Sequence, residues 1–236
     1  MLLLALDTST SAITAAVHDG HEVIAEASSV DARAHGELLA PRIAEVLAAA
    51  GAAPADLTDI VVGVGPGPFT GLRVAIVTGR VMALATEARL HGVCSLDALA
   101  FAAREAVGAG ELVVATDARR KEVYWARYAV RPAAVAAGDS SDPVTALSAP
   151  AVCRPADLPP GTADLPVVGR GPILYPEAFG PPVPGFLDVS AGALASLAVR
   201  RLQIGADLNG TVGGTEPLYL RRPDARPQVA PQSVAT

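Results

Sequence analysis

Aromatic residues and cysteines are scarce in this chain. Its 236 residues include one tryptophan, four tyrosines, four phenylalanines and two cysteines. The hydrophobic share of 51% must therefore form an aliphatic core, and the length suits one large or two small domains. Two isolated thiols, Cys94 and Cys153, exclude a disulfide framework and a cysteine metal knuckle. We expect both thiols in the core of a reduced, cytoplasmic protein.

A basic excess and long apolar runs are missing as well. The formal net charge of −6 argues against an autonomous nucleic-acid-binding protein, which normally carries a basic surplus. The N-terminal MLLLALD is too short for a signal peptide and has no basic flank, so we interpret it as a buried strand. No stretch approaches the roughly 20 continuous apolar residues of a membrane helix. The sequence predicts a soluble, cytoplasmic protein without a membrane partner.

The first half of the chain carries strand and helix patterns in turn. We expect strands at Leu2–Leu6, Ser11–His18, Glu22–Ser28 and within 56–63, with a two-residue hairpin turn at Asp19-Gly20. Apolar spacings of three and four predict a helix over His35–Ala50, with Gly51 at its C-cap. A second helix, over 71–86, is apolar nearly all round and must be covered by its own core or by a partner. A third helix is expected from Ser95, as its N-cap, to about Ala106.

The second half repeats the opening pattern. A strand ends on Asp117, a polar turn follows and Val123–Val130 returns as a strand, just as the first strand ends on Asp7. This similarity indicates an internal duplication, and Ser190–Ile204 is expected to be the final helix. The pattern predicts an α/β protein with the two-lobed plan of actin-like ATPases and sugar kinases, built on duplicated mixed sheets. We expect lobes at 1–106, to which about 207–225 returns, and 107–206, with a disordered tail at 226–236.

The glycine-rich segment GVGPGPFTGLRVA, at 63–75, allows two interpretations. As a phosphate site it fails the P-loop pattern, because Leu72-Arg73 follows Gly71, and it is one residue too long for a dinucleotide fingerprint. Pro66 and Pro68 also remove N–H groups that an anion nest needs. The structural interpretation is stronger: Thr70 caps the apolar helix, while flanking Phe69 and Val74 form a hydrophobic staple.

Other polar residues leave alternatives open. No pair among the four histidines has the spacing of a zincin, and His18 and His21 are expected to face solvent. Asp7-Thr8-Ser9 could bind a phosphate or Mg²⁺, or could form an Asx/ST turn. The main basic concentration is expected to be a solvated rim, with a tRNA contact as the alternative; it comprises Arg200, Arg201, Arg221, Arg222 and Arg226.

Six segments in order, LALDTSTSAITAAV, HGELLAPRI, VGVGPGPFTGLRVA, GVCSLDALA, DARRKEVYWARY and EPLYLRR, resemble the TsaB (YeaZ) family over nearly the whole chain. The family supplies the dimerisation subunit of the bacterial complex that synthesises threonylcarbamoyladenosine in tRNA, and Pro68 departs from its usual serine. The resemblance implies a catalytic sister subunit, TsaD, with a His-x-x-x-His metal pair. Ser95 and Leu99 stand at those positions here, so the resemblance implies a non-catalytic subunit with no metal and no required cofactor.

The resemblance also implies partners. Helices 35–50 and 71–86 would pair with two helices of TsaD, or with a second copy of this chain, while TsaE joins the pair and tRNA binds only to the complex. The candidate contact residues are His35, Leu38, Leu39, Arg42, Ile43, Val46, Leu72, Arg73, Val74, Val77, Arg80 and Val81. ATP or ADP could bind near the subunit junction, at Asp7, Thr8, Ser9, Gly65, Gly67 and Thr70. The alternative function is a small actin-like kinase or ATPase that uses Asp7 and Asp117; a metalloprotease lacks ligands.

Overall fold

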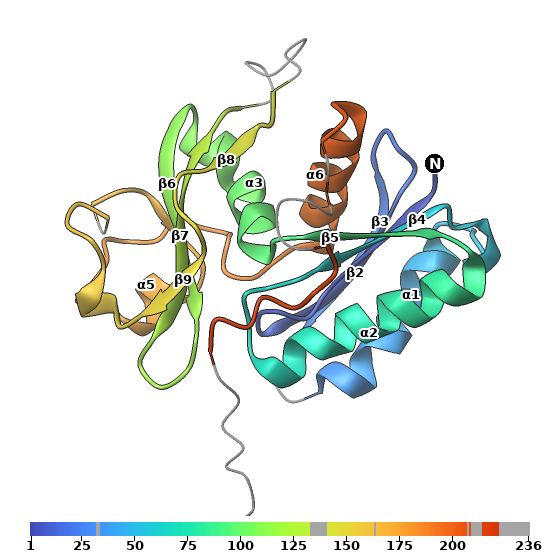
Figure 1. Ribbon diagram of the computed structural model, residues 1–236, viewed down its shortest axis with the longest axis horizontal. Helices are drawn as coiled ribbons and strands as arrows, with labels where there is room; N and C mark the ends of the chain where they lie inside the picture. The colour runs from blue at the N-terminus through green and yellow to red at the C-terminus, as the bar shows by residue number, and fades with distance from the viewer. Residues whose placement is uncertain (32–33, 133–140, 163, 207, 209–213, 222–236) are drawn as a thin grey trace, which may run out of the picture.

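The chain forms two lobes in the computed structural model, each built around a mixed β-sheet (Figure 1). The structure describes residues 1–31, 34–132, 141–162, 164–206, 208 and 214–221. The predicted tail at 226–236 lies outside these residues, as do Arg222 and Arg226. The predicted two-lobed fold with two mixed sheets is confirmed.

The first sheet has the strand order β3-β2-β1-β4-β5. Its strands are β1 Leu3–Asp7, β2 Ala12–His18, β3 Val23–Val30, β4 Asp59–Gly63 and β5 Arg89–Val93. Strand β1 is antiparallel to β2 and parallel to β4. All residues of β1, β2 and β4 are buried because helices cover both faces of this sheet.

The second sheet repeats this arrangement with the order β10-β6-β7-β8, and β9 also pairs with β7. Its strands are β6 Gly110–Asp117, β7 Val123–Val130, β8 Val144–Ala146, β9 Ala151–Cys153 and β10 Val167–Val168. Strand β6 is antiparallel to β7 and parallel to β10, as β1 is to β2 and β4. The two hairpins therefore have the same connectivity, as the duplicated pattern predicts.

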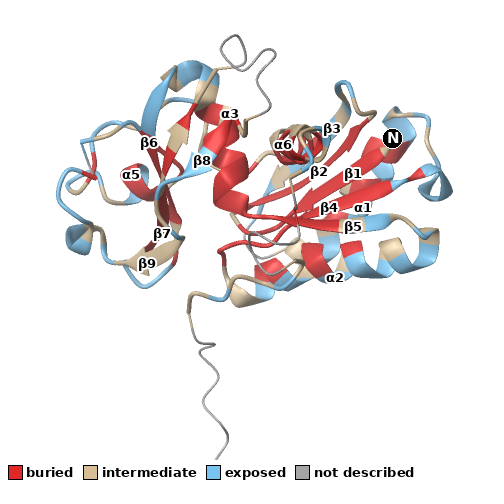
Figure 2. Ribbon diagram, turned by 45° about the horizontal axis from the view of Figure 1, so that its top comes forward, coloured by how far each residue is buried: buried red, intermediate tan, exposed pale blue. Residues whose placement is uncertain are grey.

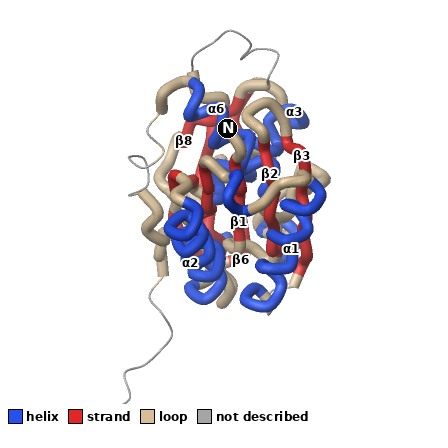
Figure 3. The backbone as a smooth tube through the Cα atoms, turned by 90° about the vertical axis from the view of Figure 1, so that its right-hand side faces the viewer, coloured by secondary structure: helices blue, strands red, loops and turns tan. Residues whose placement is uncertain are grey.

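Within the described residues, four long helices fill the layers: α1 His35–Ala49, α2 Phe69–Thr86, α3 Ser95–Val107 and α6 Ala191–Gln203. The short helices described are α5 Gly171–Leu174 and the 3₁₀ turns Pro54–Asp56 and Pro155–Asp157. Helices α1 and α2 lie beside each other on the outer face of the first sheet (Figure 3). Helix α6 covers its other face, and α3 packs between α6 and the second sheet. The predicted lobe boundaries stay a prediction, although α6, assigned from sequence to the second lobe, packs on the first sheet.

The helix ends test the capping predictions. Gly51 ends α1 as expected: its φ is +64°, and its N–H donates to the carbonyl of Ala48. The N-cap predictions for Thr70 and Ser95 are wrong, because α2 begins at Phe69 after Pro68, and Ser95 is already inside α3. The first hairpin turn spans 19–22, longer than predicted, and is closed by the N–H of Asp19 on the carbonyl of Glu22.

Candidate functional site

Helix α2 carries an apolar stripe that its own chain leaves exposed. Val77 is 54% exposed, Val81 61% and Leu84 86%, and the spacing of these three residues places them on one side of the helix. We call Val77, Val81 and Leu84 the α2 ridge. Figure 2 shows exposed residues along the outer side of α2. Among described residues, α2 is long and apolar enough to cross a membrane, but a single such helix is weak evidence.

The apolar stripe of α1, in contrast to the α2 ridge, is buried within this chain. Leu39 is 1% exposed, Ile43 6% and Val46 1%, and all three pack against the first sheet. Leu72 of α2 is also fully buried. These four residues are therefore corrected as contact candidates, because their side chains already form this chain's own core. Of the remaining candidates, Arg73, Val77, Arg80 and Val81 are exposed, and His35, Leu38, Arg42 and Val74 are half-buried.

The segment 214–221 runs along α2 and is held there by hydrogen bonds from two arginines of the helix. Arg80 donates through Nη2 to the carbonyl of Thr215 (3.0 Å) and to Glu216 Oε1 (2.7 Å). Arg73 Nε donates to the hydroxyl of Tyr219 at 2.9 Å. The described part of this segment thus contacts α2 of the first lobe, while Arg221 at its end contacts the turn after β6 of the second lobe.

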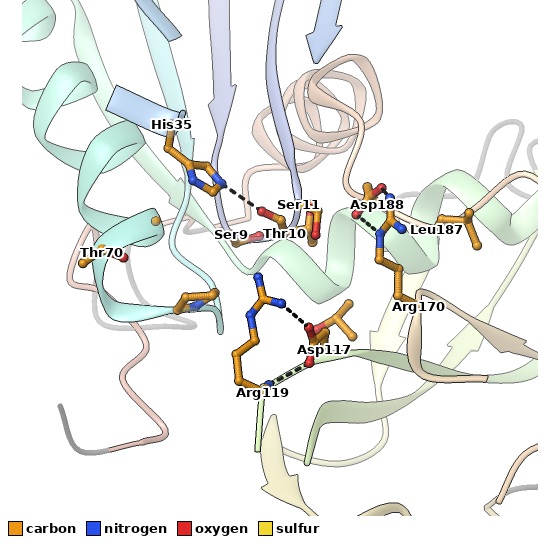
Figure 4. Close-up of a pocket in the computed structure, with 13 residues that line it drawn as sticks. Ser9, Thr10, Ser11, His35, Thr70, Asp117, Arg119, Arg170, Leu187 and Asp188 are labelled. Carbon is orange, nitrogen blue, oxygen red and sulfur yellow. Dashed lines mark hydrogen bonds and ion pairs between the residues drawn. The ribbon is translucent and has the colours of Figure 1, made fainter. Parts of the chain in front are cut away.

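A cleft between the lobes holds a cavity of about 220 Å³ (Figure 4). It is lined by Ser9, Thr10, Ser11, His35, Pro68, Thr70, Gly71, Thr116, Asp117, Arg119, Arg170, Leu187 and Asp188. The hairpin loop after β1 and the starts of α1 and α2 form one wall, and the turn after β6 forms the facing wall. Sequence reasoning predicted Ser9, Thr70 and Asp117 as functional residues but missed Arg119, although it stands in the DARRKEVYWARY segment, and Arg170, which no motif marks.

Two ion pairs face this cavity. Arg119 Nη1 lies 3.0 Å from Asp117 Oδ2, while the backbone N–H of Arg119 donates to Asp117 Oδ1 at 2.7 Å. Arg170 contacts Asp188 through both Nε (2.8 Å) and Nη2 (2.5 Å). The hydrogen bonds to Asp188 raise the pKa of Arg170 above its usual value. On the wall formed by the loop after β1 and the starts of α1 and α2, His35 Nε2 lies 3.1 Å from the carbonyl oxygen of Thr10.

Asp7 does not reach the cavity, which corrects its assignment to a nucleotide or Mg²⁺ site. It is fully buried, and its Oδ1 accepts hydrogen bonds from the N–H and the hydroxyl of Ser9, both at 2.7 Å. Its Oδ2 accepts from the Ser95 hydroxyl at 2.6 Å. Burial raises the pKa of Asp7, although these hydrogen bonds oppose the rise. The Asx/ST-turn interpretation is the one that holds.

Three further nucleotide candidates have structural roles. Thr8 is fully buried, donates to the carbonyl of Gly71 (2.7 Å) and accepts from the N–H of Ala75 (3.1 Å), which anchors α2 to β1. Gly65 and Gly67 are buried outside the cavity lining. A side chain at Gly67 would place its Cβ 2.5 Å from the carbonyl oxygen of Ser9. Gly67 thus lets its loop approach the loop that holds Ser9, while a Cβ at Gly65 would lie 2.8 Å from the side chain of Leu72.

The basic concentration is not simply a solvated rim. Arg201 is 8% exposed and pairs with Asp97 (2.9 Å) and Asp142 (2.7 Å), so it cannot contact tRNA. Arg221 donates to the carbonyl of Ala118 at 2.8 Å and pairs with Glu122.

Two smaller predictions also need correction. His18 is buried, not solvent-facing, and its Nδ1 accepts from the N–H of Gly20 at 2.9 Å. Cys94 is buried as expected, while Cys153 is only half-buried.

Comparison with known proteins first defines the class. The family model for TsaD, tRNA N6-adenosine threonylcarbamoyltransferase, matches residues 22–208. A Pseudomonas aeruginosa protein with similarity to peptidase YEAZ superposes with a TM-score of 0.76 at 31% identity, covering 93% of this chain and 99% of that one. YeaZ from the same species gives a TM-score of 0.73 at 28% identity, over 93% and 100% of the two chains.

Proteins with similar sequences identify the family more narrowly. The uncharacterised Rv3421c of Mycobacterium tuberculosis is 40% identical over 95% of this chain and 94% of its own. ML0378 of Mycobacterium leprae is 41% identical, but the match spans only 57% of that protein. The Escherichia coli protein named tRNA threonylcarbamoyladenosine biosynthesis protein TsaB is 35% identical over 54% of this chain and 55% of its own. The chain belongs to the TsaB (YeaZ) family.

Proposed function

We propose that this chain is a non-catalytic subunit in threonylcarbamoyladenosine modification of tRNA, at the adenosine next to the anticodon, and that it pairs with the catalytic sister TsaD. The observation that carries this proposal is the α2 ridge, because an exposed apolar stripe on a long helix marks a surface for another protein. The names of the TsaB relatives and the TsaD family model support the same pathway.

The absence of catalysis rests on the positions that correspond to the metal-binding histidines of TsaD. Ser95 and Leu99 are both fully buried, and Ser95 is engaged with Asp7. A leucine has no donor atom for a metal, so this pair cannot form the site.

The α2 ridge would contribute to an interface that buries on the order of 1,200–2,000 Å². The same ridge would pair two copies of this chain when TsaD is absent, TsaE would join the heterodimer, and tRNA would bind only to the complex, in the cytoplasm. No cofactor is required for this role.

An ATP or ADP near the subunit junction stays a proposal. The cleft cavity of about 220 Å³ is smaller than the roughly 300–1,000 Å³ of typical drug-sized ligand sites, so a nucleotide would need surface from a partner. The kinase or ATPase alternative is weaker, because one of its two carboxylates, Asp7, is fully buried.

Light scattering on the chain alone and mixed with TsaD from the same organism tests the pairing. The proposal predicts a one-to-one heterodimer that forms at the expense of a homodimer. A chain that stays monomeric and does not associate with TsaD would overturn it.

A further inference from the structure

We propose that a buried ionic cluster where the two lobes meet fixes the angle between them, and so holds the cleft at one width. We call Arg201, Asp97, Asp142 and Tyr128 the junction cluster. Arg201 lies on α6, on the opposite face of the first sheet from α2, so the cluster is separate from the α2 ridge. The inference does not depend on the pairing proposed above.

The junction cluster joins elements of both lobes. Arg201 is carried by α6, which packs on the first sheet, whereas Tyr128 lies on β7 of the second sheet. Asp97 is in the first turn of α3, and Asp142 stands just before β8. Figure 1 shows α3 and α6 side by side between the two sheets. A change in the angle between the lobes would therefore move these side chains relative to one another.

The hydrogen bonds of the cluster are complete. Arg201 donates through Nη1 to Asp97 Oδ2 at 2.9 Å and through Nε to Asp142 Oδ2 at 2.7 Å. Asp97 Oδ1 accepts from the hydroxyl of Tyr128 at 2.8 Å, and Asp142 Oδ1 accepts from the N–H of Val144 at 3.0 Å. Each of the four carboxylate oxygens therefore has a donor. Because the N–H directions of a guanidinium are fixed in one plane, Arg201 keeps both carboxylates in only one arrangement of α6, α3 and β8.

Burial makes this arrangement selective. Arg201 is 8% exposed, Asp97 is 9% exposed and Tyr128 is fully buried. Burial alone would lower the pKa of Arg201, but the carboxylates of Asp97 and Asp142 raise it above its ordinary value. A rotation of the lobes that separated Arg201 from Asp97 would leave a buried charge without its partner, which is strongly unfavourable. A fully satisfied polar cluster in a core thus favours a single arrangement.

The apolar contacts around the cluster are less selective. One continuous hydrophobic cluster runs from the first sheet through α3 and α6 to the second sheet, and it consists mostly of alanine, valine and leucine. Burial of apolar surface has no preferred direction, and packed helices can slide past one another by small amounts. These contacts hold the lobes together without defining one angle between them.

Two other contacts between the lobes hold them less firmly. The hydroxyl of Tyr124 donates to the carbonyl of Gly67 at 3.3 Å, which is long for an O–H donor. Arg221 donates to the carbonyl of Ala118 and pairs with Glu122, but its side chain is 23% exposed and so is reached by water. The junction cluster is therefore the contact that we expect to determine the angle.

Double electron–electron resonance between two spin labels, one on each lobe, tests the inference because it measures the distribution of distances between them. The labels are attached at Glu37→Cys on α1 and at Ala156→Cys in the second lobe, both exposed positions. The chain also carries Cys153→Ser, so that this half-buried thiol takes no label. The proposal predicts one narrow distance peak.

A triple variant, Asp97→Asn with Asp142→Asn and Arg201→Met, removes the three charges with little change in side-chain size. It should fold and give a distance distribution about twofold wider or more, because the apolar contacts alone remain. Leu194→Ala is the matched control: Leu194 is fully buried on the same helix and belongs to the surrounding hydrophobic cluster. This control should lower the thermal midpoint of unfolding but keep the wild-type width.

Circular dichroism establishes which variants fold. If the triple variant does not fold, Asp142→Asn takes its place, because the Asp142 side chain is 29% exposed and Arg201 retains Asp97; it should also widen the distribution. A wild-type width in the folded cluster variant, equal widening in Leu194→Ala, or a broad distribution in the wild type would overturn the proposal. None of these results affects the pairing with TsaD.

Discussion

The two hairpins share one connectivity and use their terminal aspartates differently. Asp7, at the end of β1, is fully buried and binds Ser9 and Ser95 of its own lobe. Asp117, at the end of β6, has a side chain that is 19% exposed and pairs with Arg119 at the cleft. The same position thus locks the interior in one copy and lines a cavity in the other, which shows that a duplicated pattern does not imply duplicated chemistry.

The connections that follow the parallel strands differ as well. Strand β4 leads into α2, with 18 residues, whereas β10 leads into α5, with four. The first copy therefore carries a long helix with one side on its own sheet and the α2 ridge on the other. For this reason the proposed partner-binding surface lies on the first lobe.

The largest loss of stability is expected on substitution of Gly63, whose backbone packs directly against the side chains of Asp7 and Ser95. An added Cβ would lie 1.7 Å from Asp7 Oδ2 and 2.7 Å from Ser95 Oγ, so Gly63→Ala should cost more than about 4 kcal/mol of unfolding free energy. Gly36→Ala in α1 is the control, since nothing lies within 4 Å of its Cβ, and it should change stability by about 1 kcal/mol or less. Urea unfolding measures both. Wild-type stability in Gly63→Ala would contradict the close packing of Asp7 and Ser95 against this glycine.

A smaller effect separates the two aspartates directly. Asp7→Ala leaves the hydroxyls of Ser9 and Ser95 buried without their acceptor, and should cost about 3 kcal/mol. Asp117→Ala removes a partly exposed pair and should cost less than about 1 kcal/mol. Thermal and urea unfolding measure the loss of stability in each variant. Equal losses would contradict the claim that Asp7 and Asp117 have different structural roles.

The smallest expected effect is a pH dependence of stability that arises from Asp59, the first residue of β4. Burial alone would raise the pKa of Asp59, but hydrogen bonds from His91, Arg89 and Thr58 hold it below its ordinary value of 3.8. A carboxyl with a lowered folded pKa stabilises the fold above the unfolded pKa, and this contribution is lost as pH falls through the folded pKa. The stability advantage of the wild type over Asp59→Asn should therefore shrink below about pH 4. A constant advantage in urea titrations at pH 3, 5 and 7 would contradict this.

Hydrophobic periodicity predicted β1 to β4, β6, β7, the long helices and the duplication, because burial of apolar faces determines those elements; it did not predict β5, β8 or β9. It could not predict the orientation of α1: a stripe such as Leu39, Ile43 and Val46 has the same spacing whether it faces its own sheet or a partner. The contact between Asp7 and Ser95 joins residues 88 positions apart and leaves no local signal. Arg119 likewise acquires its position from the lobes that meet around it.

The α2 ridge is the surface that we propose binds TsaD. Calorimetric titration of TsaD with the wild type, Val81→Glu and Val30→Glu tests it, because Val81 (61% exposed, on α2) and Val30 (64% exposed, at the end of β3) are matched in residue type and exposure. We predict that Val81→Glu weakens the affinity about 100-fold or more while Val30→Glu stays within about twofold of the wild type. Wild-type affinity in a folded Val81→Glu variant would contradict the assignment of this surface.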